Sequence, residues 1–199
     1  MTEFVGFPKI ARLSRECIIT EKIDGTNAQV FIGPDGEFLV GSKNIRITPE
    51  KDNYGFARWA TEHKEELLKL GPGRHFGEWW GNGCQRGYGL PKGEKRWSLF
   101  NVTRWCLYNE IPSIIPTADL RIEKYQDRLP ECCSLVPVLY RGIFSTLHCD
   151  AAVAWLKTNG SKAVPGFMNP EGIVCFHVAA NIGFKKTIEG DGHPKGVSA

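Results

Sequence analysis

Charged residues that could do chemistry lie beside or inside several short, apolar, strand-like runs of this sequence. They are Lys22 and Asp24 in EKIDGTN, Glu78 in FGEWWG, Glu171 in EGIVCF, and Lys185 and Lys186 in GFKKT. A lysine can act as a nucleophile or neutralise phosphate charge, and a carboxylate can bind a divalent metal or accept hydrogen bonds from hydroxyls. Taken singly, each also has a structural explanation: the carboxylates fit edge strands, the lysine pair fits a solvated tail, and Asp-Gly is a common turn.

Taken in order, five strings resemble the signature motifs of covalent nucleotidyltransferases, the superfamily of ATP-dependent RNA and DNA ligases and mRNA capping enzymes. EKIDGTN is similar to the Lys-x-Asp-Gly nucleophile motif, FGEWWG to the Gly-Glu motif, RWSLFNV to the aromatic strand motif, EGIVCF to the Glu-Gly motif, and FKKT to the final lysine motif. The resemblance runs from Glu21 to Lys186, and EKIDGTN is most similar to the RNA ligase branch that seals nicks in duplex RNA. It implies an α+β nucleotidyltransferase domain of the ATP-grasp-like ligase type, with antiparallel sheets flanked by helices.

This resemblance implies that Lys22 attacks the α-phosphate of ATP and stores AMP on the enzyme as a lysyl phosphoramidate. An unperturbed lysine, with a pKa near 10.4, is protonated at physiological pH, so nearby cations are needed to favour its neutral form. Lys185, together with Mg²⁺ or Mn²⁺, would provide that positive field and neutralise the α-phosphate as pyrophosphate departs. Glu171 would bind the metal, directly or through a bound water.

The nucleotide-binding set that the resemblance implies is wider than these three catalytic residues. Glu78 would accept hydrogen bonds from the ribose hydroxyls. Phe100 would stack on the adenine, although a phenylalanine at this place also fits a core position. The full set implied for ATP or AMP is Glu21, Lys22, Ile23, Asn27, Arg46, Glu78, Phe100, Glu171, Lys185 and Lys186.

Cationic side chains near the motifs are candidates for the phosphates of a polynucleotide. Lys43 and Arg46, in SKNIRI, match positions where relatives contact phosphate or position the nucleotide. Arg86 and Lys92 accompany the aromatic Tyr88 in the glycine-rich stretch GNGCQRGYGLPKGEK, a combination suited to phosphates and bases. The alternatives are solvated strand charges for the first pair and a mobile, solvated loop for the second.

The motifs depart from the family pattern at two places. Related RNA ligases commonly carry aspartate where this chain has Asn101, so a charge that could help to organise the site is missing. The last motif usually alternates apolar residues with lysine, whereas Lys185 and Lys186 are adjacent and would face opposite sides of a strand. We predict that Lys185 is the active-site member, with Lys186 as the alternative.

Composition is ordinary for a folded protein of 199 residues, with 42% hydrophobic and 24% charged residues. The net charge of +3 is mild, so attraction to nucleic acid would need a local basic surface. No apolar run approaches the ~20 residues that span a bilayer, and the N-terminus lacks the features of a signal peptide. The seven cysteines have no zinc-finger spacing, which favours reduced thiols in a cytoplasmic protein.

The apolar patterns predict an α+β fold with largely antiparallel sheets. Pro34-Asp35-Gly36-Glu37 predicts a hairpin turn, and near-helical spacing predicts an amphipathic helix over 54–70, capped by Asn53 and stopped by Gly71. Further strands are expected over 17–20, 75–80, 96–102, 104–109 and 171–178, and further helices over 117–129 and 146–159, the last closed by Gly160.

Only thirteen residues follow Lys186. We therefore expect residues 1–199 to form a single catalytic domain without an appended OB-fold or helical domain, and to act as a monomer. The expected function is ATP-dependent joining of 5′-phosphate and 3′-hydroxyl RNA ends, in a nicked duplex, without a membrane partner. The alternatives are DNA nick sealing by the same chemistry, and a degenerate module that binds nucleotides or RNA ends without catalysis. A capping enzyme is disfavoured because no OB-fold segment follows.

Overall fold

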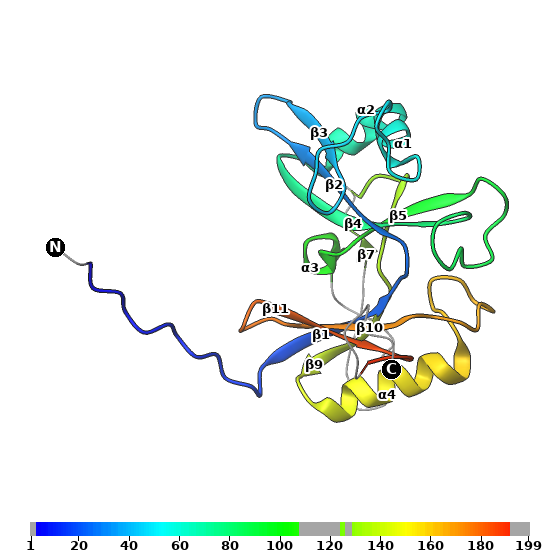
Figure 1. The fold of residues 1–199 in the computed structure, drawn as a ribbon. Helices are drawn as coiled ribbons and strands as arrows, with labels where there is room; N and C mark the ends of the chain where they lie inside the picture. Colours follow the sequence, from blue (N-terminus) through cyan, green and yellow to red (C-terminus); the bar gives the residue numbers. More distant parts are fainter. Residues whose placement is uncertain (1–2, 108–123, 126–128, 192–199) are drawn as a thin grey trace.

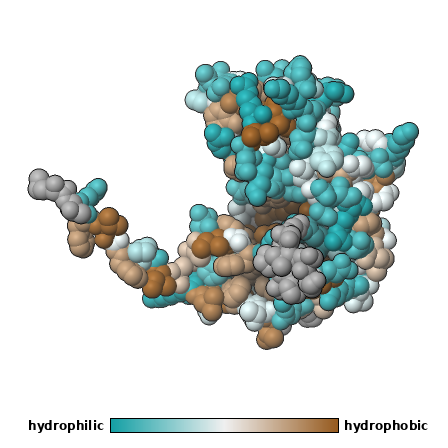
Figure 2. Space-filling model, in the orientation of Figure 1, coloured by the Kyte–Doolittle hydropathy of each residue, from teal (hydrophilic) through white to brown (hydrophobic). Residues whose placement is uncertain are grey.

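The computed structural model describes residues 3–107, 124–125 and 129–191, which form two main β-sheets with a helical layer outside each sheet (Figure 1). The fold is α+β, as predicted. Residues 3–15 extend away from both sheets and are exposed. Figure 2 shows apolar surface in the hollow between the upper and lower parts of the molecule. No described helix is long and apolar enough to cross a membrane.

The first sheet has four antiparallel strands in the order β11-β10-β1-β9. Its strands are β1 (Glu16–Lys22), β9 (Val138–Ile143), β10 (Gly172–His177) and β11 (Ile182–Thr187). Helix α4 (Thr146–Asn159) packs on one face through Cys149, Ala152, Val153 and Leu156, whose spacing of three and four residues is that of a helical stripe. The helix begins at Ser145, whose hydroxyl accepts a hydrogen bond from the Leu147 amide, and it ends at Gly160.

The second sheet has five strands in the order β3-β2-β4-β5-β8. Its strands are β2 (Thr26–Ile32), β3 (Phe38–Gly41), β4 (Gly73–Gly81), β5 (Lys95–Leu99) and β8 (Cys133–Leu135). The pairing is antiparallel except between β5 and β8, which are parallel. The predicted hairpin joins β2 to β3, and Gly36 takes the positive φ of 88° that its turn requires.

The helix predicted over residues 54–70 is divided into three short helices. These are α1 (Phe56–Glu62), α2 (Lys64–Leu67) and the 3₁₀ helix η1 (Leu68–Leu70), which ends at Gly71 as expected. The prediction of Asn53 as the N-cap was wrong. The carboxylate of Asp52 accepts hydrogen bonds from the amides of Ala57 (2.7 Å) and Arg58 (3.1 Å), whereas the Asn53 side chain donates to the Thr26 hydroxyl. A carboxylate suits this place because it complements the positive end of the helix.

Residues 96–107 also differ from the two strands predicted over 96–102 and 104–109, and residues 108–109 lie outside the described part of the chain. β5 stops at Leu99, and the chain then forms α3 (Val102–Trp105) and the short strand β6 (Cys106–Leu107), which pairs with β7 (Lys124–Tyr125). The helix predicted over 117–129 was therefore wrong at residues 124–125, and residues 117–123 and 126–128 lie outside the described part of the chain. Asn101 explains the end of the strand, because its side-chain oxygen accepts hydrogen bonds from the Thr103 hydroxyl and the Arg104 amide and so favours a helical turn.

Candidate active site

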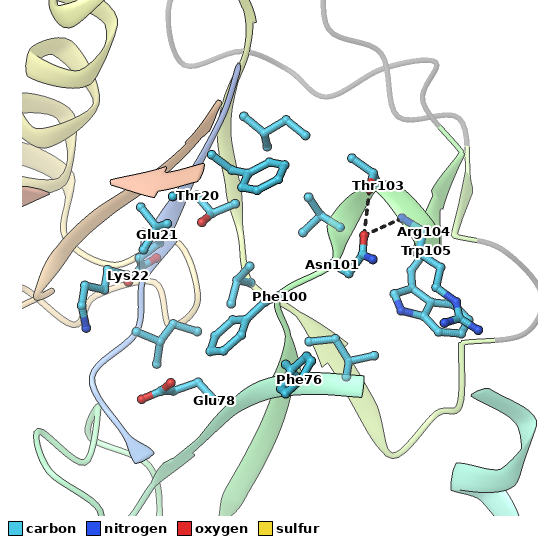
Figure 3. A pocket seen from close by; sticks show the side chains of 18 of the residues that line it. Thr20, Glu21, Lys22, Phe76, Glu78, Phe100, Asn101, Thr103, Arg104 and Trp105 are labelled. Carbon is cyan, nitrogen blue, oxygen red and sulfur yellow. Dashed lines mark hydrogen bonds between the residues drawn. The ribbon is translucent and has the colours of Figure 1, made fainter. Parts of the chain in front are cut away.

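A pocket of about 990 Å³ lies between the two sheets and receives residues from both of them (Figure 3). Its lining comes from β1, β2, β4, β5, β10, β11 and the segment around α3. The strands alternate, so one face of each packs on its helical layer and the other faces this pocket. The predicted residues that line the pocket are Glu21, Lys22, Ile23, Asn27, Glu78, Phe100 and Lys185.

Lys22 is the last residue of β1 and forms an ion pair with Glu171 across the sheet. Its Nζ donates to Glu171 Oε2 at 2.6 Å. The pair forms because β1 and β10 are antiparallel with Lys22 opposite Gly172, the residue that follows Glu171. The Lys22 side chain keeps 23% of its accessible surface, whereas the Glu171 side chain keeps 5%. The nucleophile candidate is thus reachable from the pocket, and its carboxylate partner is held in place.

The turn after Lys22 carries the chain from the first sheet into the second, and Gly25 is needed there because of close packing. A Cβ at this residue would lie 2.4 Å from the carbonyl oxygen of Trp79 and 2.8 Å from the Cβ of Trp80. Gly172 is constrained in the same way, because its Cβ would lie 2.2 Å from the carbonyl oxygen of Lys186. The glycines of the two motifs therefore let the backbones of neighbouring strands approach each other around Lys22.

Glu78 lies on β4 and is buried beside the same turn. Its carboxylate accepts hydrogen bonds from the Gly25 amide (3.0 Å) and from Asn27 Nδ2 (3.2 Å). Burial raises the pKa of Glu78 to about 7, although the nearby Lys22 ammonium and the Gly25 amide act in the opposite direction. Glu78 is therefore a hydrogen-bonding group at the pocket wall that changes its charge near neutral pH.

Arg86 connects the turn after Lys22 to the segment before Glu171. Its Nε donates to Asp24 Oδ2 at 3.0 Å, and its Nη1 donates to Asn169 Oδ1 at 2.6 Å. The Asp24 amide in turn donates to the hydroxyl of the buried Tyr88, at 3.0 Å. A contact between Arg86 and nucleic acid remains a prediction, but the guanidinium already joins two segments that carry the site.

Glu21 faces away from Lys22, as neighbours on a strand do. Its carboxylate accepts hydrogen bonds from the Ser161 hydroxyl (2.6 Å) and from the amides of Lys162 (2.8 Å) and Ala163 (3.0 Å). Burial raises the pKa of Glu21, and the hydrogen bond from Ser161 lowers it. The side chain anchors the loop after α4, so a direct contact with nucleotide would have to come from the backbone of Glu21.

The two lysines of the last motif face opposite sides of β11, as their adjacent positions predict. Lys185 is paired with Val174 in the sheet and lines the pocket. Lys186 instead extends toward α4, where its Nζ donates to Asp150 Oδ1 at 2.6 Å. The structure therefore places Lys185 at the candidate site and Lys186 outside it.

At the other end of the pocket, two phenylalanines are unusually exposed for large apolar side chains. Phe100, after β5, keeps 40% of its accessible surface, and Phe76, on β4, keeps 50%. Both line the pocket together with Val174. Sequence reasoning missed Phe76 and Val174. Phe76 could have been found from strand alternation, which puts it on the same face as Glu78, two residues later. The side-chain oxygen of Asn101 is used in the turn that starts α3.

The remaining predicted cations lie outside the pocket. Lys43 and Arg46 line a shallow groove on the open face of the second sheet, and Lys92 is exposed in the loop between β4 and β5.

Comparison with known proteins agrees with this architecture. Among solved structures, the chain is similar to Naegleria gruberi RNA ligase. A lysine-to-alanine mutant with ATP and Mn shares 17% identity at a TM-score of 0.57, covering 87% of this chain and 49% of that one. A glutamate-to-alanine mutant with AMP and Mn shares 18% identity at a TM-score of 0.55, covering 88% and 50%. At these identities the likeness shows a shared fold.

The chain spans about half the length of those solved structures. No curated protein matches it. A family model described as RNA ligase matches residues 15–185, a range that holds the first four motifs, the fifth as far as Lys185, and nearly the whole of both sheets. This chain is therefore a member of the RNA ligase family.

Proposed function

We propose that this protein is an ATP-dependent RNA ligase that joins 5′-phosphate and 3′-hydroxyl RNA ends through AMP bound covalently to Lys22. The observation that carries the proposal is the position of Lys22 at the wall of the pocket between the two sheets. Its Nζ lies 2.6 Å from Glu171 Oε2, and Lys185 lines the same pocket. Membership of the RNA ligase family and the ATP, AMP and Mn in the titles of the similar structures support it.

In the first step, the Lys22 amine would attack the α-phosphorus of ATP, forming a P–N bond while pyrophosphate leaves. The amine must be neutral to do this, and in the present arrangement the Lys22 ammonium is paired with Glu171. The proton of Lys22 must therefore be lost and the ion pair opened before attack. Positive charge from Lys185 on the same side of the sheet favours the neutral amine and stabilises the charge that develops on the α-phosphate.

The donor set fits a divalent cation held mainly by phosphate and water. Glu171 is buried and lies next to the nucleophile, and no group of three or more His, Cys, Asp or Glu within the described residues could form a full protein cage. Mg²⁺ and Mn²⁺ accept this kind of site, with one carboxylate, substrate phosphates and several waters. The bound cation would supply Lewis-acid stabilisation of the phosphate. Glu171 would hold it and, in doing so, would release Lys22.

The rest of the pocket suits a nucleoside. Phe100 and Val174 line it with apolar surface that an adenine ring can contact, which holds the base while the phosphates react. Glu78 and Asn27 line the same pocket and are hydrogen-bonded to each other, so ribose hydroxyls would reach them there. We assign Glu78 to the ribose because its carboxylate is an acceptor that burial keeps in place.

The later steps would use RNA. AMP would pass from Lys22 to the 5′-phosphate, which breaks the P–N bond and forms an adenylylated end, and attack by the 3′-hydroxyl would then release AMP. We propose a nicked duplex as the substrate and a monomer as the active form.

The test is to incubate the protein with ATP labelled at the α-phosphate and with Mg²⁺, and then to add matched nicks in RNA and DNA. Label that stays on denatured protein and moves to the RNA nick is the expected result. Transfer mainly to DNA would favour a DNA ligase, and binding of ATP without covalent label would favour a degenerate binding module.

A further inference from the structure

The second sheet has an open face beside the pocket, because its helices cover only the other side. Along β2, Ala28, Val30 and Ile32 are buried in the core with α1, and the alternate residues Gln29 and Phe31 lie on the opposite face. Those two residues line a groove of about 210 Å³ on that open face. The groove is therefore formed by β2, β3 and β4 together with residues 43–46 of the loop that follows β3.

Three cations line this groove: Lys43, Arg46 and Arg74. All three are exposed, and none of the described residues that line the groove is acidic. Within the part of the chain that the structure describes, no carboxylate forms an ion pair with any of the three. Concentrated positive charge without internal neutralisation attracts a polyanion, and here it occurs in a protein whose overall charge is only +3.

The Arg74 guanidinium lies over an aromatic ring. It is the direct cross-strand partner of Phe31, and its guanidinium lies 4.8 Å from the centre of the Phe31 ring. A guanidinium stacked on a ring keeps its N–H donors at the edge of the plane, where they can bind phosphate, and offers its other face to a base. The pair is therefore preorganised for a nucleotide.

The groove is continuous with the candidate active site. Arg74 lines both the groove and the large pocket, and Phe76, two residues further along the same face of β4, lines the pocket with 50% of its surface exposed. Between them, a second groove of about 220 Å³ is lined by Lys43, Phe76 and Phe100. A strand bound along this face would thus reach the pocket that holds Lys22.

We propose that this face, formed by Phe31, Lys43, Arg46, Arg74 and Phe76 and called here the sheet track, binds a strand of the RNA substrate. The cations contact its phosphates, and the aromatic rings stack on its bases. From Phe31 in the track to Asn27 at the wall of the large pocket, β2 runs about 13 Å at ~3.3 Å per residue, which is enough for a few nucleotides. This inference rests on the proposed function, and it adds Phe31, Phe76 and Arg74 to the cations expected from the sequence.

The test is a salt series of RNA binding, measured by fluorescence anisotropy with a short, labelled, 5′-phosphorylated single-stranded RNA. Three phosphate contacts predict that log K falls with log salt with a slope of about 2, at roughly 0.7 per phosphate. Arg74→Gln and Lys43→Gln should each weaken binding and lower that slope by about 0.7. Lys157→Gln, which removes an exposed cation from α4 on the far side of the molecule, is the matched control and should leave both values unchanged.

Phe31→Leu separates stacking from charge, because it should weaken binding several-fold while the salt slope stays as in the wild type. The proposal is overturned if Arg74→Gln and Lys43→Gln bind RNA as the wild type does, or if Lys157→Gln has the same effect as they have. Covalent labelling of the wild type by ATP is measured in parallel. If ATP labels the wild type but the variants bind RNA unchanged, the sheet track is overturned and the proposed function stands. If ATP does not label the wild type but the variants show a reduced salt slope, the sheet track stands and the proposed function is overturned.

Discussion

Lys22 and Glu171 are 149 residues apart in the sequence, and their side chains meet at 2.6 Å because β1 and β10 are neighbours in one antiparallel sheet. This pairing places the nucleophile candidate and the carboxylate candidate at one point of the pocket wall. The reaction proposed for Lys22 therefore requires this ion pair to open, because only a neutral amine can attack phosphorus.

Replacing Lys22 should abolish covalent labelling. Lys22→Ala removes the amine, whereas Lys22→Arg keeps a cation next to Glu171 but carries a group that is never neutral in proteins. We expect both variants to lose the label from α-labelled ATP completely, and Lys22→Arg to unfold at the same temperature as the wild type within a few degrees. Label at wild-type level on either variant would eliminate Lys22 as the nucleophile.

The two adjacent lysines of β11 should behave differently. Lys185→Ala removes positive charge from the pocket and should slow labelling by at least about tenfold, the order expected for losing one electrostatic contact in a transition state. Lys186→Ala breaks an exposed ion pair with Asp150, which is worth less than about 1 kcal/mol, and should label normally. The reverse pattern in a single-turnover labelling assay would show that the β11 register is wrong.

Arg86 should act as a positioning residue, because it ties the Asp24 turn to Asn169, two residues before Glu171. In Arg86→Ala we expect the labelling rate at saturating ATP to fall about 10- to 100-fold, with a smaller change in KM, since small misplacements at reacting atoms are costly. Arg86→Lys keeps a cation for Asp24 and should recover part of the rate.

The control for Arg86 is Arg96→Ala, which removes a guanidinium that pairs with the exposed Glu94 near the end of the same loop. It should leave the rate constant unchanged. If the labelling rate falls equally in the two variants, the cause is a general disturbance of the loop and not the loss of a positioning contact.

Glu78 should make both stability and nucleotide binding depend on pH near neutrality. Its pKa in the folded protein is raised to about 7 from a reference value of 4.5, so the folded state favours the protonated carboxyl. The stability that this contributes is fully present below pH 4.5 and is lost as the pH rises to about 7, by at most about 3 kcal/mol. Relative to the wild type, Glu78→Gln should therefore gain in melting temperature as the pH rises from 5 to 8.

Nucleotide binding should follow the opposite course, because the ionised Glu78 is the better acceptor for ribose hydroxyls. We expect the affinity of the wild type for AMP to rise with pH through about 7, and this rise to be absent in Glu78→Gln. Calorimetric titration with AMP at several pH values measures it. A parallel pH dependence in the two proteins would assign the titration to another group.

Gly25→Ala should destabilise the fold and the site together. The added methyl group would meet the Trp79 carbonyl oxygen at 2.4 Å, and such overpacking typically costs about 1–3 kcal/mol. Gly183→Ala is the matched control, because the nearest atom to its new Cβ, in the side chain of Val174, is 3.8 Å away. Thermal unfolding should separate the two variants by several degrees.

Helices and strands whose buried residues recur with the regular period of that element could be predicted from local sequence. Helix α4 has the predicted bounds and the predicted terminal glycine, and β4 and β10 lie where apolar runs surround Glu78 and follow Glu171. The bounds of the helices within residues 54–70 were harder to predict, because the buried apolar residues on both sides of the break pack into the same core. At His63, with φ −101° and ψ 17°, the backbone departs from helical geometry, and the chain bends so that Phe56 and Leu70 pack on the same sheet.

By itself, the sequence determined the reactive groups and their order: a lysine before an Asp-Gly turn, two carboxylates beside strand-like runs, and two adjacent lysines. Because side chains alternate along a strand, the sequence also determined that these two lysines face opposite sides of the sheet. Tertiary structure decided which groups meet. Three contacts depend on sheet order and on which face a helix covers: Lys22 with Glu171, Lys186 with Asp150, and Arg86 with Asp24. Local periodicity carries no information about these, because it describes a residue's own strand and not the strand that hydrogen-bonds beside it.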